Sequence, residues 1–482
     1  MRLIVENRFA LFGVVALALA ALFGGTLVPV SDPLGATQPG TVRPDLTARV
    51  CPAPHEGAQS TVAAYAPRVG RDDAGRLWAD VGEDLTEPGN VWLAETEGVD
   101  GPTVLRAEGS LASGLDAAQT TVTGAGMTEV RCAQPSTSTW FALPGGSGNA
   151  GVGSDGRGHV IDEDDEGDPV ETETLTVHLA NPSRTAATAS VDVYTTDGLS
   201  FSDESRGISV PAGESIEFEL TELIQQSASL GVHVRTSTGR VAASLLSEHS
   251  SGAVSWVPPT RGPAERHVIP GLPEGEGTRR LFVTSPGGDL AEARVRVLPV
   301  DGDEEELILD VPPSGSAWVT LEAALAGRSG TVVVEADVPV VAGALAEDDD
   351  TAYPAAVDPL SHPLDTTAVL PFVPDGVDAE LVVTALEGDA HLVVTPVGAD
   401  GTQGDASRVD LAAGATLVSG AEWDLPSDEG NTVRLELLEG SGPVHAARIL
   451  STEDGWSVLP VPPAPVEVRL PIARGSMVGV VP

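Results

Sequence analysis

Short runs in which apolar and polar residues alternate recur along this chain, and one series of them repeats three times at a spacing of about one hundred residues. The run at 189–198 reads ASVDVYTTDG, the run at 293–302 reads ARVRVLPVDG, and the run at 391–401 reads HLVVTPVGADG. Successive side chains of a strand point to opposite faces, so this period of two indicates antiparallel strands with one buried face. The pattern predicts tandem all-β units.

Two turn signals recur at matching places in these units. The first is an Asp-Gly dipeptide, which favours a tight turn between strands; it occurs at Asp197-Gly198, Asp301-Gly302 and Asp400-Gly401. The second is a turn rich in proline, alanine and glycine; it occurs at Pro211–Gly213, Pro313–Gly315 and Ala413-Gly414. We therefore expect each signal to mark one equivalent turn in all three units.

Seven or so short strands per hundred residues, separated by such turns, are typical of an immunoglobulin-like β-sandwich. We predict three tandem sandwiches, at residues 171–258, 266–357 and 366–460, followed by a tail at 461–482. Equivalent core positions are expected at Val191, at Val295 and within Leu392–Val394. Short helices are expected at most at Leu220–Ser229 and Leu321–Ala326.

The amino-terminal segment predicts a membrane anchor. Arg2 and Arg8 precede an uninterrupted apolar run, Phe9–Val30. About 20 apolar residues span a bilayer as a helix, and basic residues before the helix favour a cytoplasmic amino terminus. We predict a cytoplasmic segment at 1–8, a transmembrane signal-anchor helix at 9–30 and a stalk at 31–49, with the bulk of the chain extracytoplasmic. The alternative is a cleaved signal peptide with Ala18–Ala20 as the cleavage site.

The two cysteines, Cys51 and Cys132, both fall in the exported part of the chain. An even cysteine count in an oxidising compartment favours a disulfide, and we expect the two Cα atoms about 6 Å apart. A catalytic thiol or a metal site would need neighbouring histidines, and only His55 lies near either cysteine in sequence. The pattern at 50–144 therefore predicts a β-rich module closed by this disulfide.

Residues 145–170 are rich in glycine and acidic residues, and this composition predicts a flexible linker. Its acidic run carries oxygen-bearing side chains in a calcium-loop register, with Gly167 at the sixth position; the candidate ligands are Asp162, Asp164, Glu166 and Glu173. Pro169 interrupts the loop, and the flanking sequence is not helical. A solvated acidic linker is the competing interpretation.

Composition excludes several functions. Asp and Glu total 71 against 26 basic residues, the net charge is −45, and lysine is absent. Such a surface repels phosphate backbones, so we expect no nucleic-acid binding. Without lysine, Schiff-base chemistry and P-loop phosphate binding are excluded. The nine histidines show no metal-binding spacing and no serine-hydrolase elbow is present, so no catalytic residue and no cofactor is predicted.

Seven tryptophans remain as candidate sugar-stacking residues: Trp78, Trp92, Trp140, Trp256, Trp318, Trp423 and Trp456. Their places at strand ends more often indicate core or inter-domain packing.

One set of motifs resembles a known family. The set comprises Cys51-Pro52, then Cys132 leading to Trp140-Phe141, a strand ending in Asn181-Pro182, and the turn Val210–Gly213. This order is similar to an actinobacterial envelope family, domain of unknown function 5719. The resemblance implies a membrane-anchored envelope protein associated with surface glycan assembly, and it supplies no catalytic residues.

The anchor, the repeats and the lack of catalytic motifs together favour a non-enzymatic extracytoplasmic scaffold or adaptor that holds an envelope protein partner near the membrane. One alternative is a glycan-binding module that uses tryptophan and acidic loops. Another is an envelope enzyme with dispersed catalytic carboxylates, for which no site is visible in the sequence.

Overall fold

The computed structural model is all-β, which confirms the predicted fold class at that level. Its helical elements among the described residues are the 3₁₀ turn η1 (Gly109–Leu111) and the one-turn helix α3 (Glu322–Leu325). The structure describes residues 41–469 apart from 56–57, 69–72, 97–100, 124–125, 146–152, 155–159, 162–171, 221–226, 250–252, 349, 362–365, 374–375, 420–431 and 453–454. Within these ranges no helix has the length and apolar character needed to cross a membrane. The predicted anchor at 9–30 lies outside them.

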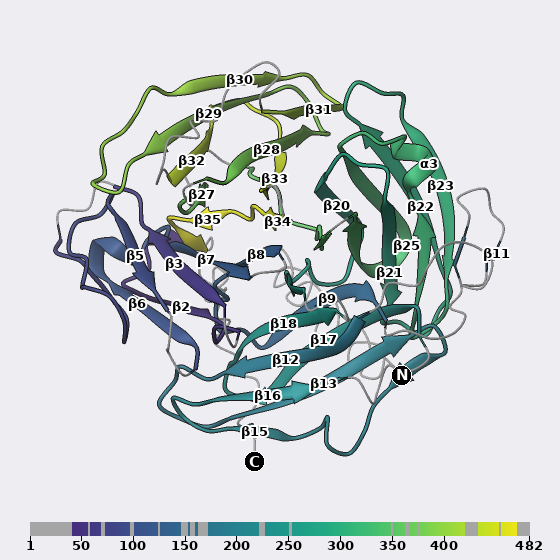
Figure 1. The fold of residues 1–482 in the computed structure, drawn as a ribbon, viewed down its shortest axis with the longest axis horizontal. Coiled ribbons are helices and arrows are strands. Elements are labelled where there is room, and N and C mark those ends of the chain that lie inside the picture. The colour runs from purple at the N-terminus through teal and green to yellow at the C-terminus, as the bar shows by residue number, and fades with distance from the viewer. Residues whose placement is uncertain are drawn as a thin grey trace, which may run out of the picture. The chain divides into compact units, whose positions relative to one another are not determined.

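The chain divides into two units. One comprises Met1–Val42 and Val468–Pro482, and in it β1 (Thr41–Val42) pairs with β36 (Val468–Arg469). The other, Arg43–Glu467, carries the remaining strands. It contains four consecutive two-sheet β-sandwiches, which we call the first module, sandwich 1, sandwich 2 and sandwich 3 (Figure 1).

Sandwich 1 defines the strand order. We call the sheet that contains the last strand of the sandwich the last-strand sheet, and the sheet that contains its first strand the first-strand sheet. The last-strand sheet has the order β16 (Ser215–Glu219), β12 (Thr172–Ala180), β18 (Ala242–His249), β19 (Val254–Val257). The first-strand sheet has the order β14 (Gly198–Ser200), β13 (Ala187–Thr195), β17 (Ser229–Thr238), β9 (Ser138–Pro144), with β15 (Ile208–Val210) also paired to β13.

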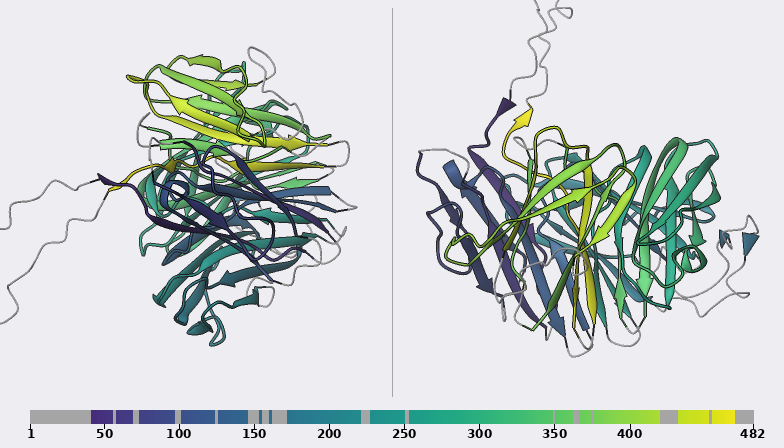
Figure 2. Two further views of the ribbon diagram at one scale, coloured as in Figure 1. Left: turned by 90° about the vertical axis from the view of Figure 1, so that its left-hand side faces the viewer. Right: turned by 90° about the horizontal axis from the view of Figure 1, so that it is seen from above.

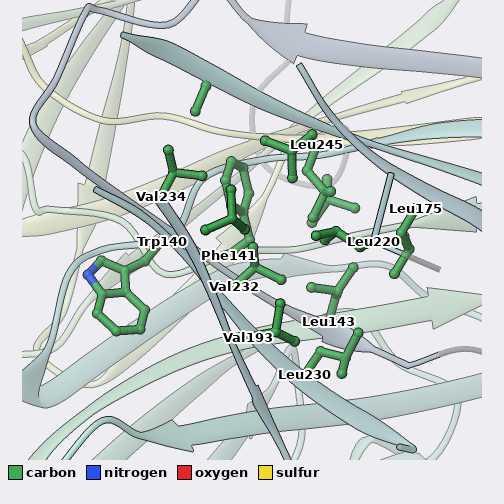
Figure 3. Close-up of a cluster of buried hydrophobic side chains, with 14 of the residues drawn as sticks. Trp140, Phe141, Leu143, Leu175, Val193, Leu220, Leu230, Val232, Val234 and Leu245 are labelled. Carbon is green, nitrogen blue, oxygen red and sulfur yellow. The ribbon is translucent and has the colours of Figure 1, made fainter. Parts of the chain in front are cut away.

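The core of sandwich 1 lies between these two sheets. Phe141, Val232 and Val193 from the first-strand sheet meet Leu175 and Leu245 from the last-strand sheet, and all are fully buried (Figure 3). The alternating pattern of the sequence thus places one apolar row of each strand inward, where burial of a side chain of this size stabilises the fold by about 1.5–3 kcal/mol.

The other three sandwiches repeat this order. In sandwich 2 the last-strand sheet has the order β24 (Gly315–Thr320), β21 (Thr278–Ser285), β25 (Gly330–Glu347), β26 (Thr351–Ala352). The first-strand sheet has the order β23 (Glu305–Val311), β22 (Ala291–Pro299), β25, β20 (Ala264–Leu272), and the long strand β25 takes part in both sheets. In sandwich 3 the last-strand sheet has the order β31 (Ala415–Val418), β28 (Asp378–Ala385), β33 (Val444–Ser451), β34 (Trp456–Pro460). The first-strand sheet has the order β30 (Ser407–Leu411), β29 (Ala390–Val397), β32 (Thr432–Leu437), β27 (Thr366–Leu370), and β35 (Ala464–Pro465) pairs with β27. In the first module the last-strand sheet has the order β5 (Val91–Glu95), β3 (Gln59–Tyr65), β7 (Asp116–Thr123), β8 (Gly126–Arg131). Its first-strand sheet has three strands, which in the direction used for the other sandwiches are β4 (Arg76–Trp78), β6 (Thr103–Glu108), β2 (Leu46–Cys51). Figure 2 shows the same strands from two further sides.

The predicted turns fall at the same point of sandwiches 1, 2 and 3. Each Asp-Gly dipeptide follows the third strand, namely β13, β22 or β29. At the second turn the amides of Gly213, Ser314 and Gly414 donate to a carbonyl at or just after the end of the second strand, at 2.9, 2.6 and 2.7 Å. All three residues have positive φ, so in sandwich 2 the left-handed position is Ser314 and not the glycine that follows it.

One boundary differs from the expected one. β9, which ends the predicted module at 50–144, pairs with β17 and supplies the first strand of sandwich 1. The segment 145–170 therefore connects two strands of one sandwich and does not separate two domains. Within it, β10 (Gly153–Ser154) pairs with β11 (Val160–Ile161) and lies parallel to β24 of sandwich 2.

Candidate functional site

The four sandwiches pack in a closed series of contacts. The last-strand sheet of each sandwich lies against the first-strand sheet of the preceding one, and the first module closes the series against sandwich 3. We call the three contacts between consecutive sandwiches joints and the closing contact the seam. The last strands also form a circuit: β8 contacts β19, β19 contacts β26, β26 contacts β34, and β34 contacts β8.

A cavity of about 520 Å³, which we call the acidic cavity, opens beside the start of β34. Sandwich 2 and sandwich 3 both line it. Its polar lining comes from Glu274, Asp348, Asp350, Glu380, Ser451 and Thr452, and its aromatic lining from Trp456. Cavities at domain contacts with an apolar surface and a few converging polar groups are preferred ligand sites.

Hydrogen bonds fix the half-buried Trp456 in this cavity. Its backbone amide donates to Asp350 Oδ2 at 3.1 Å, and its indole Nε1 donates to the Asp350 carbonyl at 3.0 Å. The Arg279 guanidinium lies 5.1 Å from the indole centre and donates to Asp348 Oδ2 at 2.7 Å. Arg279 itself is fully buried, so one cation–π contact is built into the wall of the cavity.

The carboxylates of the acidic cavity outnumber their cationic partners. Burial raises the pKa of Asp350, although amides of Thr351, Trp456 and Met127 oppose this rise. Burial also raises the pKa of Glu380, and the nearby carboxylates Glu274 and Asp378 raise it further. A site with this excess of oxygen acceptors beside an indole can bind hydroxyl-rich or cationic ligands.

A second cavity, of about 220 Å³, lies where the crossover segments after β19, β26 and β34 meet the end of β8. We call it the proline cavity. Its walls include Pro258, Pro259, Pro460 and Pro462, and Arg261 forms an ion pair with Asp358 at 2.7 Å. Its lining is therefore mostly apolar, with one charged pair.

The seam carries buried charge. Glu129 of β8 and Arg448 of β33 form an ion pair, and both side chains are almost completely buried. The Glu129 amide donates to Ser457 Oγ at 2.8 Å. Arg131 pairs with Asp116 and donates to the Pro460 carbonyl at 2.8 Å. Burial raises the pKa of Glu129, while Arg448 and Thr120 oppose the rise.

One serine–histidine pair has the spacing of a nucleophile and its base. Ser138 Oγ lies 2.9 Å from His233 Nε2. His233 stacks on Trp140, and Asp192 bonds Arg235 at 2.6 Å. Burial lowers the pKa of His233 to about 4, and Arg235 contributes in the same direction. Since an imidazole with so low a pKa is a weak proton acceptor, this geometry fits a structural hydrogen bond better than catalysis.

The residues singled out in the sequence have different outcomes. Cys51 and Cys132 form the predicted disulfide, with Cα atoms 4.1 Å apart, closer than the expected 6 Å. Asp162, Asp164 and Glu166 lie outside the described residues, and Glu173 lies in β12. In the part of the chain that the structure describes, no three His, Cys, Asp or Glu side chains are grouped to hold a metal.

The tryptophans divide between core and surface. Trp92, Trp140, Trp256 and Trp318 are buried, Trp78 is half-buried on β4, and Trp423 lies outside the described residues. Sequence reasoning did not separate Trp456 from the others, because its partners Asp350 and Arg279 belong to the preceding sandwich.

These observations define an all-β protein built from four consecutive sandwiches of one strand order. A family model, Family of unknown function (DUF5719), matches residues 170–420, and the chain belongs to this family. No curated protein matches the chain.

Two solved structures are similar to it at 11% sequence identity. One is a tetra-tandem repeat in the extending region of a large adhesion protein, covering 87% of this chain and 94% of that chain with a TM-score of 0.11. The other is the Streptomyces avermitilis alpha-L-rhamnosidase complexed with L-rhamnose, covering 86% of this chain and 55% of that chain with a TM-score of 0.13.

Proposed function

We propose that this protein is a non-enzymatic scaffold or adaptor of the cell envelope, anchored in the membrane by residues 9–30, with its sandwiches outside the cytoplasm. In this proposal the sandwiches are of immunoglobulin-like kind and hold an envelope protein partner that takes part in surface glycan assembly. The observation that carries the proposal is the closed series of sandwich contacts, because it fixes several outward surfaces with respect to one another.

The contact between sandwiches 1 and 2 has the character of a permanent interface. Apolar side chains such as Phe282 and Trp318 of sandwich 2 are completely buried in one core with Trp140 of sandwich 1. At the seam the buried ion pair of Glu129 and Arg448 adds directional bonds. Because the net charge is −45, electrostatic attraction favours a partner with a basic surface.

Crosslinking in intact cells tests this function. The chain lacks lysine, so the reagent must couple carboxylates, for example a dihydrazide with a carboxyl activator. We expect one envelope protein to crosslink to the wild type and to be lost from the variant Glu129→Ala, which opens the seam. The matched control Glu304→Ala removes an exposed ion pair with Arg296 and should leave the crosslink unchanged. A catalytic activity abolished by one point substitution would contradict the proposal.

A glycan-binding module is the second candidate, and the acidic cavity favours it. Trp456 offers an aromatic surface, while Ser451, Thr452 and the carboxylates offer hydrogen-bonding groups around it. Sugar rings combine apolar faces with hydroxyl groups, so they match a site of this composition.

A glycan array with and without calcium tests this second function. We expect binding that Trp456→Ala abolishes. Trp78→Ala is the matched control, because Trp78 is also half-buried but lies on β4 of the first module. Binding that survives Trp456→Ala would place the sugar site elsewhere, and silence of the wild type on the array would count against glycan binding.

A further inference from the structure

The joints that follow sandwich 1 and sandwich 2 contain clusters of hydroxyl groups. Thr284 and Thr384 occupy the same position, near the end of the second strand of their sandwiches. Between sandwiches 1 and 2, Thr284 Oγ1 donates to Ser316 Oγ at 3.1 Å, and Ser316 Oγ lies 2.5 Å from Ser229 Oγ. Between sandwiches 2 and 3, Thr384 Oγ1 lies 2.6 Å from Thr331 Oγ1. Both clusters are buried and uncharged.

In sandwich 1 this position is occupied by Ala180, which pairs with Ser215 as Thr384 pairs with Thr416. Two residues earlier, on the same face of β12, the first joint has a histidine, His178, which pairs with Glu217 on one neighbouring strand and with Ser244 on the other. With Glu217 it lines a cavity of about 20 Å³ against the first module. The lining from the first module is apolar and consists of Val50, Pro52, Ala53 and Pro102.

The His178 imidazole has poor hydrogen-bonding opportunities in this joint. Its Nε2 atom is buried and has no hydrogen-bond partner. Its Nδ1 atom lies 3.5 Å from Glu217 Oε1, which is longer than an ordinary hydrogen bond. The Trp256 indole meets the ring edge-on, with centroids 5.3 Å apart. Neutral imidazole fits such surroundings better than imidazolium, which carries two N–H donors.

The charged and titratable groups on the segments packed around His178 come from β16, β18, β6 and the segment after β2. Glu217 of β16 and Glu248 of β18 favour its protonated form, and His55, in the segment after β2, opposes it. On the module side, Arg106 of β6 donates to the Pro182 carbonyl. Burial outweighs the two carboxylates and lowers the pKa of His178 below its usual 6.5.

We propose that the contact between the first module and sandwich 1 is an acid-sensitive joint, in which protonation of His178 places a charge against the apolar surface of the module and separates the two. The sign follows from proton linkage. In the closed joint the pKa of His178 lies below 6.5, whereas in an opened joint the ring is exposed and its pKa returns to about 6.5. The closed form is therefore favoured above pH 6.5, and this advantage is lost as the pH falls. The inference does not depend on the proposed function.

Backbone amides that bond across the first joint report its opening. The Trp256 amide donates to Thr128 Oγ1 at 2.8 Å, and the Ser136 amide donates to the Val241 carbonyl at 2.8 Å. Hydrogen exchange of the full chain between pH 7 and pH 5, corrected for intrinsic rates, measures their protection. We expect protection of the Trp256 amide to fall by up to about tenfold per pH unit below 6.5, since one proton binds on opening.

His178→Thr replaces the imidazole with a hydroxyl side chain that does not titrate in this pH range, and it should abolish the acid-dependent loss of protection. His445→Thr is the matched control: it removes a buried imidazole at the joint between sandwiches 2 and 3, whose Nδ1 lies 3.2 Å from the Val357 carbonyl. This control should leave the response of the Trp256 amide unchanged.

The proposal is overturned if wild-type protection at Trp256 does not change with pH, or if His178→Thr retains the change. Unaltered protection in β22, which contains none of the substituted residues, shows that each variant is folded. If His178→Thr lowers protection throughout the chain, His178→Asn provides a second non-titrating variant, and it must also abolish the response.

Discussion

The first module and the three sandwiches that follow it share one strand order but are stabilised differently. In its described residues the module has a three-stranded first-strand sheet, β2-β6-β4, where sandwiches 2 and 3 have a further strand beyond the third. Its core contains many alanines and is crossed by the disulfide of Cys51 and Cys132. The three sandwiches have larger cores, in which most side chains are Val or Leu, and they contain no cysteine.

This difference indicates that covalent and ionic bonds offset a smaller apolar core in the module. Less buried apolar area means less hydrophobic stabilisation. The disulfide lowers the entropy of the unfolded chain, and the seam places the Glu129–Arg448 ion pair between the module and sandwich 3. By contrast, the joints that follow sandwich 1 and sandwich 2 contain buried, uncharged hydroxyl clusters. Removal of each kind of bond should therefore have effects of different size.

The largest effect is expected at the seam. Glu129→Ala leaves the Arg448 charge buried and without its carboxylate, and it should lower the free energy of unfolding by about 3–5 kcal/mol. Urea unfolding measures this change. Glu129→Met combined with Arg448→Met removes both charges and should recover most of the loss. If the single and double variants are equally unstable, loss of packing and not an unpaired charge is the cause.

The next effect concerns the disulfide. It joins residues 81 positions apart, and a loop of this length corresponds to about 4 kcal/mol in the chain-entropy model. Cys51→Ala with Cys132→Ala should lower the stability of the module by up to this amount, as measured by urea unfolding. Hydrogen exchange in sandwiches 2 and 3 serves as the control and should not change. A loss below about 1 kcal/mol would show that the disulfide contributes little to the stability of the module.

A smaller effect is expected at the uncharged joints. Thr384→Val leaves the buried hydroxyl of Thr331 without its partner and should cost about 1–3 kcal/mol. Thr331→Val with Thr384→Val removes both hydroxyls and should be closer to neutral. The free energies of both variants, obtained by urea unfolding, test the contrast with the seam. A larger loss in the double variant than in the single one would contradict this account.

Local signals in the sequence predicted much of the fold. Alternation at 189–198, 293–302 and 391–401 predicted the third strand of each sandwich, because side-chain period is a property of the strand itself. The buried positions of Val191 and Val295 agree with that prediction. β9 was placed in the module at 50–144 and not in sandwich 1, because its partner β17 lies far along the chain and no local feature of Ser138–Pro144 specifies this partner.

The candidate site was less predictable for a similar reason. Asp350 and Trp456 come from different sandwiches, and with 71 acidic residues the sequence offered no basis for choosing Asp350. His178 was one histidine among nine, and its importance depends on the apolar surface of the first module that faces it. Contacts between sandwiches, unlike strand periodicity, depend on how the folded units pack.

The smallest expected effect concerns a turn that the sandwiches share and tests how closely they correspond. Gly213 and Gly414 occupy the left-handed position in sandwiches 1 and 3, whereas Ser314 occupies it in sandwich 2 with φ of 50°. A residue with a Cβ atom is strained there, by about 1 kcal/mol. Ser314→Gly relieves this strain but gives the unfolded chain more freedom, and it forfeits the bond from Ser314 Oγ to the Gly287 carbonyl. We expect a net gain of at most about 0.5 kcal/mol in the free energy of unfolding.

The reverse change provides the matched comparison. Gly414→Ser introduces the same strain into sandwich 3, where a Cβ atom would meet no neighbouring atom within 4 Å. It should therefore destabilise through backbone strain alone, by about 1 kcal/mol. Urea unfolding of the two variants measures both signs. If Gly414→Ser is neutral, the two turns differ in backbone energetics despite their matching hydrogen bonds, and the correspondence of the sandwiches is limited to strand order.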